Sequence, residues 1–383
     1  MPIHFTAEDL ADRRTAAMAE LRARNLDALL MFRQESLYYL TGYDTFGYVF
    51  FQTIVLTADG RMVLLTRSAD QRQAKFTSVV TDIRVWVDRE GANPAEDLKV
   101  ILTELGLKGA KLGVEYDAYG LTARNGNRLD AAMAGFAILE DASDLVTRQR
   151  LVKSAAEITY VRHAAGLADR AWDAAIATAK PGAFEGDILA AMHGEIYKGG
   201  GDDPANEFII GSGSGAMMCR YFTGRRTLDA NDQLTLEFAG AYRHYHSALM
   251  RTLRVGKPPA RQLELWKAAQ DALLACEAAL KPGRTVGEVF DAHAKSLDSA
   301  GLSSARLNAC GYSLGTTFAP NWMDWPMLYK DNPVVAAPGM VFFIHMIIFD
   351  DASGLAATLG RTSLVTPSGS EVLSKANLDF VIK

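Results

Sequence analysis

Two long helical segments, each closed by a Pro-Gly pair, constrain the fold of this chain more than any other feature. The first ends at Pro181-Gly182 and the second at Pro282-Gly283, and a further helical stretch follows each pair. Because the same helix, turn, helix order occurs twice with strands beside each copy, we predict an internally duplicated α/β domain. The alternative is that Pro-Gly is simply a common helix stop. The four predicted helices cover residues 151–178, 184–197, 260–280 and 286–300.

The first 146 residues have a different pattern, in which short strands alternate with helices. Helical spacing predicts a helix over residues 7–24, and the turn Ala58-Asp59-Gly60 predicts a hairpin between two apolar runs. Further strands are expected at residues 28–32 and 112–115. We therefore predict two domains, with the boundary between residues 146 and 147.

Composition narrows the classes of protein to consider. The chain of 383 residues is 49% hydrophobic and 22% charged, which is ordinary for a globular protein. A net charge of −5 argues against a general nucleic-acid surface. Cys219, Cys276 and Cys310 are odd in number and far apart, which is typical of a reducing compartment. With no apolar signal segment in view and no apolar run long enough to span a bilayer, we expect a cytoplasmic protein without a membrane partner.

Several motifs, in their order along the chain, resemble the pita-bread family of methionine aminopeptidase, prolidase and creatinase. The segment EFAGAYRHYHSALMRT, residues 237–252, is similar to a metal-binding hairpin of that family. The resemblance implies a creatinase-type N-terminal domain followed by a pita-bread catalytic domain, in which a duplicated α/β unit forms a curved antiparallel sheet. The other matching segments are LTGY at 40–43, RQRLVKSAAEI at 148–158, GYSLG at 311–315, PGMVF at 338–342 and LVT at 364–366.

The chain departs from the family at the metal ligands. In the metallopeptidases two Asp, one His and two Glu hold two ions, and the corresponding positions here are Glu237, Ala248, Tyr312, His345 and Gly360. A dinuclear site needs several carboxylates to offset the ionic charge, and only one remains. We therefore expect no metal cofactor. A single ion held by Glu237, His246 and His345 is the alternative.

Some members of the family work without metal, and the chain resembles them. Creatinase and the ectoine hydrolases attack a C–N bond at an amidine or guanidine-like carbon. Creatinase has a glutamate where Met250 stands here, whereas the Glu-x-Ala-Gly and Tyr-His pattern of the hairpin is more similar to ectoine hydrolase. The resemblance implies a metal-independent hydrolase of a C–N bond in a small polar solute, with no cofactor.

Strand periodicity predicts which side chains line the site. Alternate residues of a strand face the same way, so His244 and His246 should share the face of Ala248. Glu237 is the first catalytic candidate, as a general base for water or as a nucleophile, and His246 is its expected acid–base partner. His345, inside an apolar strand, is the third catalytic candidate. The alternatives are a Glu237 ion pair and hydrogen-bonded structural histidines.

The remaining site candidates would contact the substrate. Tyr312, in place of a ligand histidine, could donate a hydrogen bond to an anionic group. Tryptophan faces beside one carboxylate suit a cationic or amidinium solute. In creatinase-like dimers, the segment after LTGY reaches the neighbouring pocket, which implies a homodimer here. The predicted substrate-binding residues are Tyr312, His244, Trp322, Asp324, Trp325, Phe46 and Tyr48.

Three rival functions remain open from the sequence. The first is an Xaa-Pro metallopeptidase, which would contain bound Mn or Zn. The second is a lyase acting on a small charged solute, which would incorporate no solvent oxygen into its product. The third is a noncatalytic binding protein of the same fold.

Overall fold

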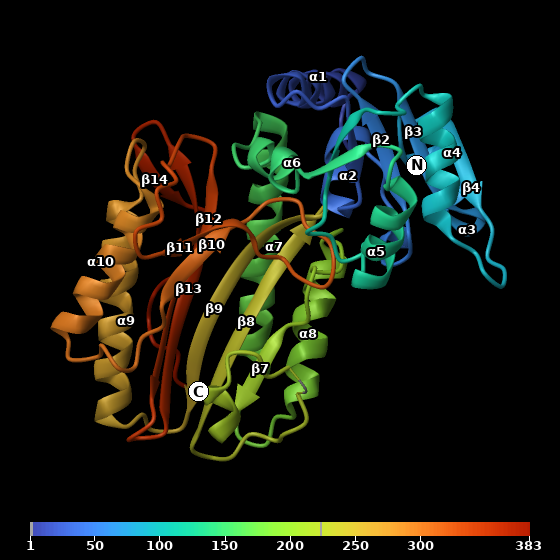
Figure 1. Cartoon of the computed structure of the whole chain (residues 1–383). Coiled ribbons are helices and arrows are strands. Elements are labelled where there is room, and N and C mark those ends of the chain that lie inside the picture. The colour runs from blue at the N-terminus through green and yellow to red at the C-terminus, as the bar shows by residue number, and fades with distance from the viewer. Residues whose placement is uncertain (1–2, 223) are drawn as a thin grey trace. The chain divides into compact units, whose positions relative to one another are not determined.

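The computed structural model describes residues 3–222 and 224–383, which form two compact units, Met1–Arg150 and Leu151–Lys383 (Figure 1). The boundary predicted from the sequence, between residues 146 and 147, lies within helix α6 (Asp144–Gln149) of the first unit. Within the described residues, no helix combines the length and the apolar character needed to cross a membrane.

The first unit is a three-layer α/β structure. Its six strands form one mixed sheet in the order β4-β3-β2-β1-β5-β6, and helices cover both faces. Alternation within the strands explains the two covered faces, because Leu30 and Val55 pack against α4 and α5, whereas Leu29 and Ile54 pack against α1 and α2. The elements are α1 (Ala7–Ala23), β1 (Ala28–Met31), α2 (Gln34–Thr41), η1 (Gly47–Val49), β2 (Thr53–Thr57), β3 (Met62–Arg67), α3 (Ser68–Thr77), β4 (Asp82–Trp86), α4 (Pro94–Glu104), β5 (Lys111–Val114), α5 (Ala123–Met133), β6 (Ile138–Asp141) and α6.

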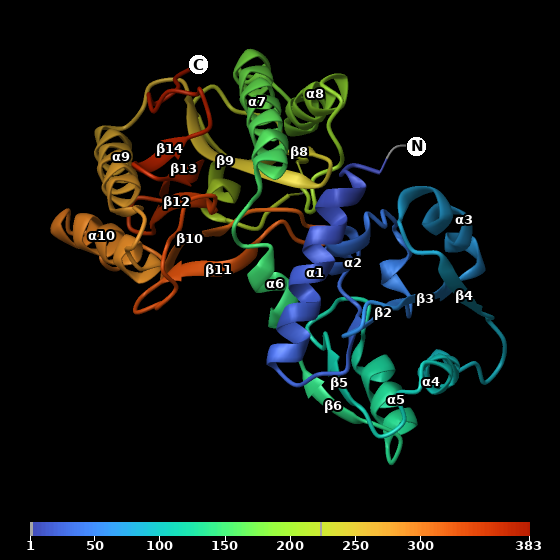
Figure 2. The same ribbon diagram turned by 90° about the horizontal axis from the view of Figure 1, so that it is seen from above.

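The second unit is built around one eight-stranded sheet. Its strands follow the order β11-β10-β12-β13-β9-β8-β7, with β14 paired to β13. Helices α7 and α8 contact each other beside β8 and β9, and α9 and α10 do the same beside β12 and β13 (Figure 2). The elements are α7 (Ala155–Thr178), α8 (Glu185–Lys198), β7 (Ile209–Ser212), η2 (Gly213–Met217), β8 (Asp232–Tyr242), β9 (Tyr245–Val255), α9 (Ala260–Ala279), α10 (Val286–Ser299), β10 (Ala309–Ser313), β11 (Asp324–Tyr329), β12 (Val341–Asp350), β13 (Leu355–Thr366) and β14 (Gly369–Val372).

The four helices of the second unit lie on one face of its sheet. Trp172 of α7 stacks on Phe238 of β8, with ring centroids 6.4 Å apart. Glu277 of α9 forms a two-bond ion pair with Arg361 of β13, at 2.7 Å for each bond. Neighbours in a strand point to opposite faces, so Glu237 and Gly360, next to Phe238 and Arg361, face away from the helices.

The turn between β8 and β9 corrects one sequence prediction. Tyr242 pairs with Tyr245, so Arg243 and His244 form a two-residue turn, and both have left-handed backbone conformations, with φ of 50° and 64°. Such a turn matches the right-handed twist of a hairpin. The prediction that His244 belongs to the strand is therefore wrong, whereas the alternation from His246 onwards holds.

Candidate active site

One row of paired residues crosses the helix-free face of the second sheet. Glu237 of β8 pairs with Met250 of β9, Met250 with Gly360 of β13, and Gly360 with His345 of β12. Directly paired residues project from the same face of a sheet. The register alone therefore places Glu237 and His345 on one surface, at the two ends of a four-strand row.

A chain of hydrogen bonds joins the two halves of this sheet. The Tyr312 hydroxyl on β10 donates to Oε1 of Glu237 at 3.1 Å, and Nε1 of Trp322 donates to the Tyr312 oxygen at 2.8 Å. Because the indole N–H can only donate, it directs the hydroxyl proton of Tyr312 towards Glu237. In a flat sheet, β10 and β8 would lie about 19 Å apart, so the 3.1 Å contact reflects strong curvature.

A cavity of about 320 Å³ lies against these residues. Glu237 and Arg220 are its charged residues among those described, and most of its wall is apolar. The combination of an apolar wall with a few polar groups is typical of a small-molecule site. The cavity is lined by Asn206, Ile209, Cys219, Arg220, Glu237, Leu307, Asn308, Ala309, Tyr312, Asn321, Trp322, Met323, Met327, His345 and Ile347.

The electrostatics of the cavity centre on Glu237. Burial raises the pKa of Glu237 to about 7, while the Tyr312 hydrogen bond and the positive charge of Arg220 oppose the rise. Burial and the neighbouring Glu237 raise the pKa of Tyr312 well above its ordinary value, so its hydroxyl keeps its proton. At neutral pH the Glu237 carboxyl is therefore divided between a base and its conjugate acid, beside a fixed hydrogen-bond donor.

His345 lies in the cavity wall as a neutral imidazole. Burial, with a smaller contribution from His293, lowers the pKa of His345 to about 3. Its Nδ1 atom is buried and has no hydrogen-bond partner among residues 3–222 and 224–383. A buried ring nitrogen without a partner loses its hydration without compensation, which favours the neutral form of the ring; because this atom is closed to solvent, another part of the ring faces the cavity.

His246 does not fit the acid–base role expected from the sequence. Its Nε2 accepts the backbone N–H of Ala205 at 2.9 Å, and its Nδ1 lies 3.1 Å from the Thr317 hydroxyl. It does not line the cavity, and it lies four residues, about 13 Å, along the strand direction from the Glu237 row. Burial lowers its pKa to about 3. The structure therefore places His246 outside the cavity, as a neutral histidine whose two ring nitrogens bind residues of two loops.

His244 is also displaced from the predicted site. It stacks on Phe318 with ring centroids 4.1 Å apart, and its backbone N–H donates to Asp202 at 2.9 Å. It is absent from the cavity wall because the turn takes it out of the strand. The expectation that it contacts substrate is corrected for the same reason.

The tryptophan-rich segment divides between the cavity and the protein interior. Trp322 is buried and lines the cavity, whereas Trp325 packs against the apolar core under α9 and α10. Asp324 is buried outside the cavity, where its Oδ1 accepts the Trp325 N–H at 2.9 Å. Of the three residues predicted here, only Trp322 is placed to meet a substrate in this cavity.

Phe46 and Tyr48 lie in the first unit, Phe46 directly before η1 and Tyr48 within it. Phe46 is 73% exposed, whereas Tyr48 is buried, and their rings meet edge to face at 6.3 Å. Burial raises the pKa of Tyr48 to about 12. Neither residue belongs to the cavity of the second unit.

The residues at the five metal-ligand positions do not fit a dinuclear centre. Ala248 offers no ligand atom, and its backbone N–H and C=O are both bonded to the Thr362 hydroxyl at 2.9 Å. A Cβ at Gly360 would lie 2.9 Å from the Phe343 ring, so that ring fills the space of a fifth ligand. In the part of the chain that the structure describes, no three His, Cys, Asp or Glu side chains group as metal ligands.

Sequence reasoning missed several residues of the cavity. Arg220 and Cys219 come from the loop between β7 and β8, and Asn206 comes from the loop before β7. Loop residues follow no periodicity, so no alternation argument could place them. The signal for Asn321 was its position next to Trp322 in a Pro-flanked segment.

Comparison with known proteins identifies relatives along the whole chain. A model of metallopeptidase family M24 matches residues 159–367, and a model of the creatinase/prolidase N-terminal domain matches residues 13–152. The chain is 25% identical over 400 residues to the ectoine hydrolase of Halomonas elongata, covering 99% of this chain and 98% of the relative. It is 24% identical over 379 residues to an Xaa-Pro dipeptidase of Pyrococcus horikoshii, with 97% and 100% covered. The crystal structure of dipeptidase PepE from Mycobacterium ulcerans superposes with a TM-score of 0.85 at 25% identity, covering 99% of both chains.

Proposed function

The chain belongs to metallopeptidase family M24, a hydrolase family, and from that premise we propose that it hydrolyses a C–N bond of a small amidine or amidino-type solute without a metal ion. The predicted fold, a creatinase-type N-terminal domain followed by a pita-bread domain, is confirmed by the family models and the solved structures. One observation carries the proposal: Glu237, at the position of the first metal ligand, faces the cavity, with its pKa raised to about 7.

The surroundings of Glu237 suit proton transfer at neutral pH. A general base works best when its pKa lies near the operating pH, because its conjugate acid is then strong enough to return the proton. Tyr312 engages only Oε1 in the described contacts, which leaves the other carboxylate oxygen for water or substrate. Glu237 could therefore carry both the basic and the acidic step, including the step for which His246 was expected.

The reaction can be written with Glu237 as the base. The carboxylate takes a proton from water while the water oxygen bonds to the amidine carbon. The C–N bond then breaks, and the leaving nitrogen takes the proton back from Glu237. In the covalent alternative, a Glu237 oxygen bonds to the amidine carbon, the C–N bond breaks, and the leaving nitrogen takes a proton from water. The resulting hydroxide attacks the Glu237 carboxyl carbon and releases the product, so the solvent oxygen stays in the Glu237 carboxylate.

His345 and Trp322 would complete the site. His345 lines the cavity, and its neutral imidazole can donate or accept a hydrogen bond there, depending on the tautomer. The indole of Trp322 keeps the Tyr312 proton directed at Glu237. Neither residue needs to change protonation state in either form of the reaction.

A second function has support of its own. The Xaa-Pro dipeptidase of Pyrococcus horikoshii is nearly as similar to this chain as the ectoine hydrolase is. An Xaa-Pro dipeptidase activity would use a peptide bond as substrate. The replaced ligand positions at Ala248 and Gly360 count against it, because two metals activate water in that chemistry.

The test is a product assay in ¹⁸O-water with ectoine, creatine and Gly-Pro, each with chelator and each with added Mn²⁺. We expect hydrolysis of an amidine substrate, one solvent oxygen in the product, and no response to either addition. Cleavage of Gly-Pro that requires Mn²⁺ would overturn the proposal, and an unlabelled product would indicate a lyase. Label found in the Glu237 carboxylate after a single turnover would select covalent attack.

We also propose that the protein forms a homodimer. Phe46, Val49 and Phe50 are exposed apolar side chains on one short segment of the first unit, and such a group is unfavourable in water. Light scattering after gel filtration should show a dimer, and the double substitution F46S and F50S should weaken it. A monomeric wild type at micromolar concentration would contradict the proposal.

A further inference from the structure

Arg220 is the positively charged side chain of the cavity among the described residues. It is exposed, and within residues 3–222 and 224–383 it forms neither an ion pair nor a hydrogen bond. It is near enough to Glu237 and Tyr312 for its charge to lower the pKa of both groups. A guanidinium without a partner beside a mostly apolar wall can form charge-assisted bonds with a ligand.

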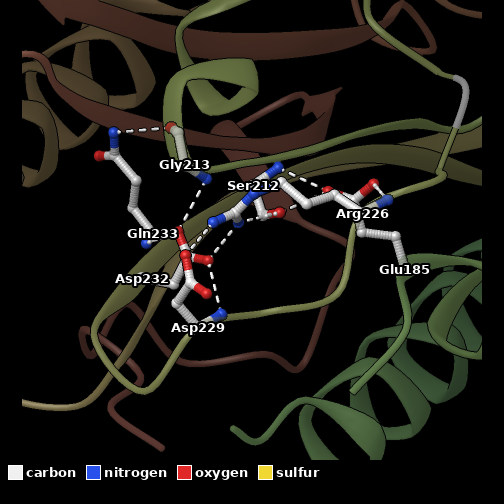
Figure 3. Close-up of polar contacts among 7 residues, drawn as sticks. All are labelled: Glu185, Ser212, Gly213, Arg226, Asp229, Asp232 and Gln233. Atoms are coloured by element: carbon white, nitrogen blue, oxygen red, sulfur yellow. Dashed lines mark hydrogen bonds and ion pairs between the residues drawn. The ribbon is translucent and has the colours of Figure 1, made fainter. Parts of the chain in front are cut away.

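The loop that carries Arg220 is fastened at its beginning by a buried carboxylate (Figure 3). Glu185, the first residue of α8, accepts the backbone N–H of Ser212 at 2.7 Å and its hydroxyl at 2.6 Å. Glu185 also accepts the backbone N–H of Arg226 at 2.9 Å. One fully buried side chain therefore holds both the start and the later part of this loop.

Arg226 fastens the end of the same loop. Its guanidinium donates to the Ser212 hydroxyl at 2.8 Å and forms ion pairs with Asp229 and Asp232 (Figure 3). Asp232 in turn accepts the Gly213 N–H at 2.8 Å. These bonds close a ring of contacts around the base of the loop.

The middle of the loop is attached as well. The backbone N–H of Ile210, on β7, donates to the Tyr221 carbonyl at 2.9 Å, next to Arg220. The backbone directly after Arg220 is therefore held, while the Arg220 side chain has no hydrogen-bond or ion-pair partner among the described residues. A fixed backbone under an unpaired guanidinium is the arrangement expected of a preorganised anion-binding group.

We propose that Arg220 binds a carboxylate of the substrate, and that Arg226, through its contacts with Glu185, Ser212 and Asp232, positions the loop that presents it. This inference rests on the proposed function and narrows its substrate class to an amidino acid. The carboxylate would pair with the planar guanidinium, and the amidine carbon would then face Glu237. A solute with a cationic group but no carboxylate would be disfavoured, because it would meet Arg220 unpaired.

The test compares a carboxylate probe with its neutral amide. Calorimetry would use 4-guanidinobutanoate and 4-guanidinobutanamide on the full-length E237Q protein, in which we expect binding without turnover. We expect the carboxylate to bind about tenfold more tightly, since a charge-assisted pair is lost in the amide. Adding R220Q should equalise the two affinities. R225Q, an exposed arginine on the same loop outside the cavity, is the matched control and should keep the preference.

Arg226 needs a separate readout because it acts through the loop. R226Q should reduce the preference for the carboxylate towards that of R220Q, increase hydrogen exchange of residues 219–222, and leave the affinity for the amide unchanged. If R226Q lost the same affinity for both probes, Arg226 would have only a general structural role, and that part of the proposal would be overturned. A preference that survives in R220Q would overturn the role of Arg220.

Failure of this inference is distinguishable from failure of the proposed function. If no amidine is hydrolysed but R220Q removes the preference for the carboxylate, the binding role stands and the reaction is another. If an amidine is hydrolysed but wild type and R220Q bind both probes equally, the reaction stands and Arg220 has no binding role.

Discussion

Two buried glutamates, one in each unit, have the same pKa and very different surroundings. Burial raises the pKa of Glu115 to about 7, as it does for Glu237. Glu115 accepts the backbone N–H of Phe32 at 3.0 Å, that of Arg33 at 2.9 Å and the Ser36 hydroxyl at 2.5 Å. Glu237 accepts one hydrogen bond among the described residues, from Tyr312, and faces a cavity.

The contacts of Glu115 explain its place in the fold. Arg33 is the residue before helix α2 and makes no side-chain cap of its own. The first N–H groups of a helix lack partners within it, and a carboxylate there is favoured by the helix dipole. Glu115, the residue directly after β5, therefore caps the start of α2, and both of its carboxylate oxygens accept hydrogen bonds there.

The comparison shows that a raised pKa does not by itself identify a catalytic residue. Burial sets the pKa of both carboxyls, whereas the number of donors and the presence of a cavity decide what each can do. Glu237 retains an oxygen for a reacting molecule, and Glu115 does not. Substitutions at the two positions should therefore affect different properties of the protein.

The largest expected effect is the loss of turnover in E237Q. Glutamine keeps the shape of the side chain and an acceptor for Tyr312 but cannot take a proton or attack carbon. We expect kcat on ectoine or creatine, whichever is hydrolysed, to fall on the order of 10³-fold. E115Q is the matched control and should keep the kcat of the folded fraction. Near-normal turnover in E237Q would remove Glu237 from the mechanism.

The second effect is a loss of stability in E115Q. Below pH 4.5 the folded Glu115 carboxyl carries one donor hydrogen, whereas the amide carries two, and the second would face N–H groups or lack a partner; we expect this to cost about 2–3 kcal/mol at that pH. Hydrogen exchange of the Phe32 and Arg33 amides in the full-length protein should speed up, while E237Q leaves these amides protected. Unchanged exchange in E115Q would contradict the capping role.

The pH dependence of that stability has a defined sign. The pKa of Glu115 in the folded protein, about 7, lies above the ordinary value of 4.5. Between pH 4.5 and 7 only the unfolded chain loses the proton, so the free energy of unfolding falls by about 3 kcal/mol as pH rises. E115Q has no titrating carboxyl at this position, so its free energy of unfolding should not show this fall. The stability difference between wild type and E115Q should therefore be largest below pH 4.5 and should shrink towards pH 7.

The fold could be predicted from the sequence because its signals are local. The Pro-Gly stops and the alternating strands placed most helix ends within a few residues. Helix α7 was an exception: it begins at Ala155, four residues after the predicted start, because Ser154 and Glu157 form a capping box. The turn at Arg243-His244 was missed because neither residue is a typical left-handed turn former.

The candidate site could be predicted only in part. Glu237, Tyr312 and His345 were found because they occupy ligand positions of a similar family, and the strand register brings them to one surface. His246 lies outside the cavity because its partners Ala205 and Thr317 come from loops distant in sequence. No sequence pattern ties such loops to the sheet, and Arg220 was missed for the same reason.

The smallest expected effect tests the one hydrogen bond that Glu237 accepts, in contrast to the three that Glu115 accepts. The Tyr312 hydrogen bond lowers the pKa of Glu237, so Y312F should raise that pKa further, by up to about one unit. Because the carboxylate form predominates above the pKa, activity should rise with pH through about 7 in wild type, and this rise should move to higher pH in Y312F.

Y329F, which removes the hydroxyl of an exposed tyrosine on β11, is the control and should leave the pH profile of wild type unchanged. The measurement is the pH dependence of kcat/KM between pH 5 and 9. A Y312F profile that coincides with that of Y329F would mean that Tyr312 does not bond the catalytic carboxylate, and a shift to lower pH would mean that another group titrates.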